Sequence, residues 1–343
     1  MKSLYKRIFI AAAVLLSPLA AGAQLTLNTL QLQARADFQS DSYADSHENG
    51  FRGKYLNLYL EGGLGNNLTY SYRQRFTKPV ISSSYWDATD WIWADWKFND
   101  KWSVNAGKQI VQIGGFEYDR APINLYQCSE FWNNIACYQL GVSTSFRPTE
   151  SDMLTFQICQ SPNRSAYKNM YSYNLMWRGT RGLWSSIYSL NLVEAVPGSF
   201  LTYIALGNQF AWGDFTFSLD LMSRISSEHA ELIRDISIMA EAAYRPMDNV
   251  NVFLKCTYDG NDKNKLDFCV LPGTSIGRFG AGAEYYPIKD NSLLRLHAQL
   301  AYATGKNGNP AGVLRDKYFM FDCGMTLQLD FIKTFFKNGR KKE

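Results

Sequence analysis

The sequence is poor in the residues from which most enzyme centres are built. It contains three histidines, His47, His229 and His297, and no CxxC pair, so a zinc site is not expected. GxSxG, P-loop and HExxH patterns are also absent, which argues against the common hydrolases, nucleotide-binding enzymes and metalloproteases. His297 has no Ser or Asp partner suggested by spacing along the chain. We therefore predict a non-enzymatic protein without a cofactor or a bound metal.

Long hydrophobic runs are missing after residue 24, so transmembrane helices are not expected there. The first 23 residues begin with basic side chains, continue with an apolar run from Ile8 to Leu16, and end in small residues. This is the pattern of a cleaved secretory signal. A membrane-anchoring helix is the alternative, but the run is shorter than the roughly 20 residues that a span requires. We expect residues 1–23 to be a signal peptide and the remainder to be exported.

An excess of charge of one sign is also lacking. The net charge is +4, but the first 23 residues and the stretch after Phe331 hold more positive charge than this, so the body between them is slightly acidic. Nucleic acid is therefore not an expected partner. Residues 332–343 are predicted to form a basic periplasmic tail that either contacts anionic lipid or is disordered.

Cysteine is present but gives no clear framework. The six cysteines are Cys128, Cys137, Cys159, Cys256, Cys269 and Cys323. Pairs 128–137 and 256–269 could each close a loop, because the chain is expected to be exported. Small buried thiols are the other possibility, and the sequence leaves both open.

The dominant positive signal is alternation of apolar and polar residues. KYLNLYLEG, LTYSYRQRF, FTFSLDL and LLRLHAQLAY all show the two-residue period of a β-strand. Sixteen such segments begin near residues 26, 51, 68, 88, 102, 135, 152, 171, 183, 200, 215, 235, 250, 276, 293 and 318. Seven short connections alternate with eight longer ones, as in a bacterial outer-membrane barrel. An even strand number places both termini at the end with the short turns, the periplasmic side. A soluble β-sandwich is the alternative.

Lipid offers no hydrogen-bond partners, so a sheet that spans it must close, with its apolar face outward and its polar face toward the lumen. Aromatic residues near strand ends would form the interfacial girdles of such a barrel. These residues are Trp91, Trp96, Trp102, Trp177, Tyr244, Tyr286, Tyr318 and Phe331. We predict an all-β fold, a 16-stranded antiparallel transmembrane β-barrel over residues 24–331.

The stretch KQIVQIGGFEYDRAPINLYQCSEFW, residues 108–132, has no clear period and contains the longest connection. A long structureless segment in a compact domain is usually functional, and a barrel of this width has an open channel unless something fills it. We predict that residues 112–134, the third long loop, fold inward and set the size limit. Glu117, Tyr118, Asp119 and Arg120 would then lie at the narrowest point. A loop that covers the rim is the alternative.

LNLYLEGGLGNNLTYSYRQRFTKP and DWKFNDKWSVNAGKQIVQIGGFEYDRAPINLYQCSEFW resemble the phosphate-selective porin O and P family, of the type in Bacteroidetes-like outer membranes. The similarity is strongest over residues 50–132. It implies a sixteen-strand barrel in the outer membrane of a Gram-negative bacterium, usually a homotrimer, that passes small anions such as phosphate along lumenal basic residues. The candidates for pore-lining residues here are Arg73, Arg75, Asp95, Lys97, Lys255, Arg278 and Arg295.

The strand period places seven basic and seven acidic side chains in the lumen, so it predicts no net anion-attracting field. Arg73 and Arg75 share one face of a strand, and Lys97 on the next strand could lie close to them, so this cluster could still guide anions. The alternative is that the charges only brace and solvate the wall. The prediction is passive diffusion of small hydrophilic solutes, among which anions such as phosphate are the candidates that the resemblance implies. A plugged structural or adhesive barrel, or less readily a barrel hydrolase, is the alternative function.

Overall fold

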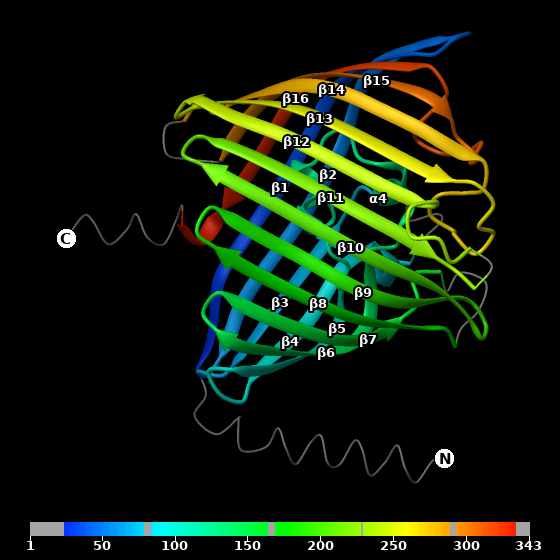
Figure 1. The fold of residues 1–343 in the computed structure, drawn as a ribbon. Coiled ribbons are helices and arrows are strands. Elements are labelled where there is room, and N and C mark those ends of the chain that lie inside the picture. The colour runs from blue at the N-terminus through cyan, green and yellow to red at the C-terminus, as the bar shows by residue number, and fades with distance from the viewer. Residues whose placement is uncertain (1–23, 79–83, 164–168, 228, 289–292, 334–343) are drawn as a thin grey trace.

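The computed structural model describes residues 24–78, 84–163, 169–227, 229–288 and 293–333. Sixteen strands form one closed antiparallel barrel (Figure 1), which confirms the predicted fold class. The strands are β1 (Leu25–Ser42), β2 (His47–Leu64), β3 (Leu68–Arg75), β4 (Thr89–Lys97), β5 (Trp102–Ile110), β6 (Tyr138–Thr149), β7 (Asp152–Gln160), β8 (Tyr171–Arg181), β9 (Trp184–Val196), β10 (Ser199–Trp212), β11 (Phe215–Ile225), β12 (Ile236–Met247), β13 (Val250–Asn261), β14 (Thr274–Tyr285), β15 (Leu294–Lys306) and β16 (Tyr318–Asp330).

The barrel closes between its first and last strands. β1 pairs with β16 in a continuous antiparallel register from Gln31 opposite Asp330 to Ser42 opposite Phe319. No strand edge is left open, as a sheet in lipid requires. The first and last strands begin and end at the short-turn end of the barrel (Figure 1), as the even strand number predicts. Helices in the described ranges are all too short and too polar to cross a membrane.

The strands are apolar on the outside and polar on the inside. On β13, Leu254 is 63% exposed whereas its neighbours Lys255, Thr257 and Asp259 are at most 4% exposed. The exposed apolar faces form the surface that meets lipid. Aromatic side chains pair at the short-turn end, where Trp102 stacks on Phe146 at 4.5 Å between ring centres.

Two residues predicted for the girdles lie inside instead. Trp91 packs against Arg73 in the lumen, and Tyr318 is buried and donates a hydrogen bond to Asp41. On their strands, both residues occupy positions of the same parity as the inward-facing residues, so the two-residue period alone indicates that they face the lumen. The prediction was wrong because it relied on their being aromatic residues near strand ends.

Replacing Leu254 by Arg should destabilise the barrel by about 2–4 kcal/mol, because it places a charge on the lipid-facing side of a central strand. The measurement is denaturant unfolding in lipid vesicles, followed by tryptophan fluorescence. Leu254→Met is the control and should leave the transition nearly unchanged. An Arg variant as stable as the Met variant would show that this face does not contact lipid.

Six of the seven predicted short turns are present, and the seventh, around Lys289 and Asp290, lies outside the described residues. The prediction of eight long connections is wrong at two places. β9 and β10 are joined by Pro197 and Gly198 alone, and β1 and β2 by residues 43–46. At the first, Gly198 has a φ of 79°, a left-handed conformation that suits glycine and allows a tight turn. At both places the two strands continue almost to each other, which shortens the loop.

The connection from β5 to β6 lies inside the barrel. It contains α3 (Phe116–Asp119), η1 (Pro122–Asn124) and α4 (Glu130–Asn134), and Figure 1 shows α4 surrounded by strands. A further short helix, α2 (Tyr85–Ala88), precedes β4. We call residues 111–137 the inner loop.

Candidate functional site: the lumenal passage

The inner loop is seated on an apolar patch of the inner wall. Ile113 and Phe131 belong to one buried cluster with Val193 on β9 and Leu201 and Tyr203 on β10. Each of the five is at most 3% exposed. Burial of this surface holds the loop against one side of the barrel, because removing apolar area from water is favourable. The signal in the sequence is the pair of segments LVEAV and FLTYIAL, in which apolar residues occupy both faces where β9 ends and β10 begins.

Carboxylates of the adjoining part of the wall hold the N-termini of the two α-helical turns. Asp220 on β11 accepts the backbone N–H groups of Phe116 (2.9 Å) and Glu117 (2.8 Å) at the start of α3. Asp259 on β13 accepts the N–H of Glu130 at 2.7 Å at the start of α4. Unpaired N–H groups at helix starts favour such negative partners. Gly115, which precedes α3, has no side chain to cap it, so the wall supplies the cap.

Basic residues of the wall donate to backbone carbonyls of the same loop. The pairs are Arg35 Nη1 with Leu125 O (2.9 Å), Lys255 Nζ with Tyr126 O (3.1 Å), Arg278 Nη1 with Cys128 O (3.4 Å) and Arg295 Nη2 with Ile123 O (3.1 Å). These donors come from β1, β13, β14 and β15, so four of the sixteen strands hold the backbone of the loop. These charges satisfy buried backbone groups, which would otherwise be costly.

The charged loop residues also pair with the wall. Glu117 contacts Lys255 Nζ at 2.7 Å, Arg120 contacts Glu241 on β12 at 2.8 Å, and Asp119 pairs with Arg178 on β8. Glu117 is 6% exposed, so it acts within the anchor. The side chains of Arg120 and Asp119 are 30% and 38% exposed, so they also face open space.

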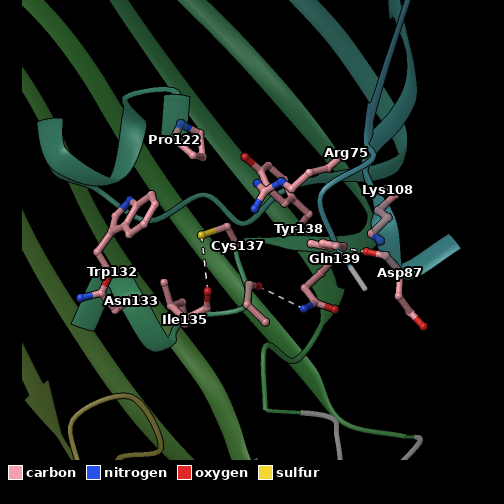
Figure 2. A pocket seen from close by; sticks show the side chains of 12 residues that line it. Arg75, Asp87, Lys108, Pro122, Trp132, Asn133, Ile135, Cys137, Tyr138 and Gln139 are labelled. Atoms are coloured by element: carbon pink, nitrogen blue, oxygen red, sulfur yellow. Dashed lines mark hydrogen bonds between the residues drawn. The ribbon is translucent and has the colours of Figure 1, made fainter. Parts of the chain in front are cut away.

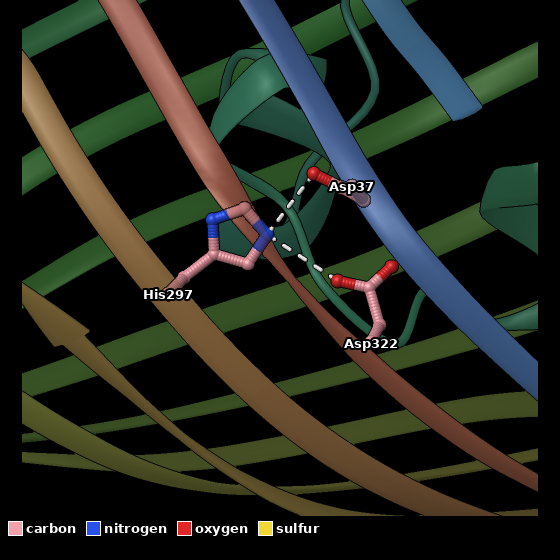
Figure 3. A group of neighbouring side chains, drawn as sticks. All are labelled: Asp37, His297 and Asp322. Carbon is pink, nitrogen blue, oxygen red and sulfur yellow. Dashed lines mark ion pairs between the residues drawn. The ribbon is translucent and has the colours of Figure 1, made fainter. Parts of the chain in front are cut away.

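A buried triad lies at the barrel seam (Figure 3). His297 Nε2 on β15 is 3.1 Å from Asp37 on β1 and 3.3 Å from Asp322 on β16, two partners that spacing along the chain did not suggest. Sequence spacing cannot show partners that meet across three strands. Among the described residues this triad has the spacing of a metal site. However, Arg35 Nε contacts both oxygens of Asp37, at 3.0 and 3.1 Å, and competes with any cation.

The same seam holds the loop through Tyr126. Its ring stacks on Phe253 at 5.3 Å, lies 5.1 Å from the His297 ring, and receives the Arg35 guanidinium at 4.5 Å. Cation–π and aromatic contacts of this kind each stabilise by about 0.5–1.5 kcal/mol. We therefore assign the triad to the anchor of the loop.

Open space remains on the other side of the loop, along β2 to β6. A cavity of about 300 Å³ near the long-loop end is lined by Arg75, Lys78, Asp87, Lys108, Pro122, Trp132, Asn133, Ile135, Ala136, Cys137, Tyr138 and Gln139 (Figure 2). A second cavity, of about 260 Å³, is lined by Tyr59, Ser71, Arg73, Trp91, Trp93, Ile110, Tyr118, Asp119, Arg120, Ala121, Pro122, Trp132, Cys137 and Tyr138. They share Pro122, Trp132, Cys137 and Tyr138, so they adjoin; we call the two together the passage.

Basic side chains predominate along the passage wall. Asp90 is fully buried and contacts Arg73 Nε (3.0 Å), Arg75 Nη2 (3.1 Å) and Lys78 Nζ (3.7 Å). The side chains of Arg75 and Lys78 are 18% and 34% exposed. One hidden carboxylate therefore holds three cations, two of which face the opening. Burial lowers the pKa of Lys78, and the charge of Asp90 partly offsets this.

The predicted site residues thus separate into three groups. Arg73, Arg75, Tyr118, Asp119 and Arg120 line the passage, whereas Lys255, Arg278, Arg295 and Glu117 anchor the loop. Asp95 and Lys97 lie on β4 toward the short turns, and Lys97 is exposed beside Asn67. The expected closeness of Lys97 to Arg73 is wrong, because Arg73 pairs with Trp91 six residues away along β4.

Sequence reasoning missed Asp90, Lys78 and Lys108. The register shifts at Asp90, where Arg73 faces Trp91 but Gln74 faces Thr89. Such a bulge re-aims side chains, and the strand period cannot show it. The six cysteines are all free, so the loop-closing disulfides left open above do not form.

A closed sixteen-strand barrel with an apolar exterior, a polar lumen and a loop folded inside defines a porin-type outer-membrane channel, a non-enzymatic class. Solved structures share the fold. An anion-selective porin from Comamonas acidovorans matches at 14% identity and a TM-score of 0.65, covering 90% of this chain and 100% of that chain. The outer-membrane channel DcaP of Acinetobacter baumannii matches at 9% identity and 0.65, covering 90% and 98%. The trimer form of OmpT from Vibrio cholerae matches at 12% identity and 0.59, covering 89% and 99%.

Residues 28–191 match the model of the family described as phosphate-selective porin O and P. This confirms the resemblance carried by β2 to the inner loop. No curated protein sequence matches the chain. The protein is therefore a porin of the outer membrane of a Gram-negative bacterium.

Proposed function

We propose that this porin lets small hydrophilic solutes diffuse passively and favours anions, phosphate among them. The observation that carries the proposal is the segregation of charge between the two sides of the inner loop. The passage is lined by five basic residues, Arg73, Arg75, Lys78, Lys108 and Arg120, and two acidic ones, Asp87 and Asp119. The apparent balance of charge over the whole lumen arises because many of the other charges hold the loop.

A local excess of positive charge in a narrow, low-dielectric passage concentrates anions. Asp90 does not cancel it, because one carboxylate faces three cations and is hidden behind them. A homotrimer in outer-membrane lipid is proposed from the family and from the trimer form of the Vibrio cholerae protein, which has a similar fold.

Cys137 offers a native test of the route, because it lines both cavities. A bulky thiol reagent added to the protein in a planar bilayer should lower the steady current by about half or more, since it would obstruct a constriction. Burial raises the pKa of the Cys137 thiol to about 11, so the block should develop faster as pH rises from 7 to 9.

Cys137→Ser should conduct like the unmodified protein and resist the reagent. Block that persists in Cys137→Ser, or modification of Cys137 without loss of current, would place the route elsewhere. A folded barrel without steady current would contradict the diffusion function itself.

A further inference from the structure

The second cavity of the passage, of about 260 Å³, is lined by more aromatic rings than simple diffusion requires. Six rings surround it, those of Tyr59, Trp91, Trp93, Tyr118, Trp132 and Tyr138. Trp91 is fixed in place: its Nε1 donates to Ser71 Oγ at 2.8 Å, and Tyr59 and Tyr138 pack against it at 5.9 and 5.7 Å. The rings therefore form an ordered surface.

A cation at the same cavity has unused hydrogen-bonding capacity. Arg73 lies over Trp91 at 4.5 Å and contacts Asp90 through Nε, and its side chain is 2% exposed. Its Nη2 has no hydrogen-bond partner within the described ranges. A buried guanidinium donor without an acceptor is costly, and a carboxylate or phosphate is the acceptor that fits it.

The rings select against a bare inorganic anion as the best ligand. The face of an aromatic ring carries negative charge, so it repels an anion and attracts apolar or polarised C–H groups. Trp93 and Trp132 line the cavity, and no ring in the described part of the chain stacks on them. Their faces are therefore available to a second ring.

We propose that this cavity is a binding site for small organic anions that carry a ring with an apolar face. Aromatic carboxylates and sugar phosphates share this chemistry. The anionic group would meet Arg73, and Arg120 on the inner loop would face the same space. The ring would lie against Trp93 and Trp132. This inference rests on the proposed diffusion function and names the solutes that pass most effectively at low concentration.

The test is isothermal titration of the refolded protein in detergent with benzoate, glucose 6-phosphate, acetate and inorganic phosphate, alongside bilayer recordings of the same preparation. We expect benzoate, glucose 6-phosphate or both to bind at least about tenfold more tightly than acetate and inorganic phosphate. Trp93→Leu/Trp132→Leu should weaken that binding about tenfold, through loss of two ring contacts. Whether benzoate or glucose 6-phosphate binds more tightly identifies the source of the ligand.

Trp96→Leu is the matched control, because Trp96 lies on the same strand with the opposite parity, and it should bind like the unmodified protein. Arg73→Lys retains the pair with Asp90 but loses the guanidinium fork, and should also weaken binding. Equal affinity for ringed and ringless anions, or no effect of the tryptophan substitutions in a variant that still conducts KCl, would overturn the site and leave the porin. Tryptophan-dependent binding without any current would support the site and overturn the diffusion function.

Discussion

Arg75→Gln/Lys78→Gln should lower the chloride-over-potassium permeability ratio at least about tenfold. At about 5 Å in water each unit charge changes the free energy of a passing monovalent ion by ~0.8 kcal/mol, about fourfold, and two charges act together here. The two residues are chosen because both side chains face the passage. Arg73 is retained in the variant, so Asp90 keeps a cationic partner. The measurement is the reversal potential in a KCl gradient.

Lys97→Gln/Lys101→Gln is the control, because both side chains are exposed near the short turns, away from the passage. It should leave the ratio within about twofold of the unmodified protein, as expected for screened surface charges. Because burial lowers the pKa of Lys78, the selectivity of the unmodified protein should also weaken with rising pH before ordinary lysines lose their charge. A ratio that is insensitive to Arg75→Gln/Lys78→Gln would exclude this wall as the anion path.

Asp220→Ala/Asp259→Ala should enlarge the channel. Each substitution removes the carboxylate that accepts the N–H groups at one helical start of the inner loop, and a charged hydrogen bond contributes about 1.5–3 kcal/mol. With both removed, the loop should leave its seat part of the time. Single-channel conductance should rise by roughly twofold or more, with added open-state noise, because a sixteen-strand barrel without a filling is wide.

The control for the loop is Asp214→Ala/Asp248→Ala, which removes two exposed acids in turns. Its conductance and noise should match those of the unmodified protein. If Asp220→Ala/Asp259→Ala folds and conducts with the original amplitude, the apolar cluster of the loop is sufficient to hold it, and the capping carboxylates do not set the pore size.

Much of the fold could be predicted because a lipid-facing barrel repeats one rule. Every strand must alternate, so even short segments such as β3 show the period. The number of strands, their order and the short turns followed from that rule. The lengths of the connections at the other end of the barrel did not follow from that rule. Pro197 and Gly198 form a tight turn, so β9 and β10 continue where a long loop was expected.

The candidate site was harder to predict, because parity gives the face of a side chain but not its partner. Arg73 and Lys255 both face inward, but only Arg73 lines the passage. Lys255 instead forms a salt bridge with Glu117 and donates a hydrogen bond to a loop carbonyl. Which role a cation takes depends on where the inner loop is seated, and that depends on contacts distant in sequence. Asp259, which accepts a hydrogen bond at the start of α4, was missed although it continues the inward parity of β13, because the predicted segment ended at Tyr258.

The most direct measurement is the current through the refolded unmodified protein in a planar bilayer under a KCl gradient. An open passage lined by excess positive charge predicts a steady ohmic current whose reversal potential lies toward that of chloride. A steady current reversing toward the potassium potential would contradict the role assigned to Arg73, Arg75 and Lys78. A folded, inserted barrel that passes no current would contradict the open passage altogether.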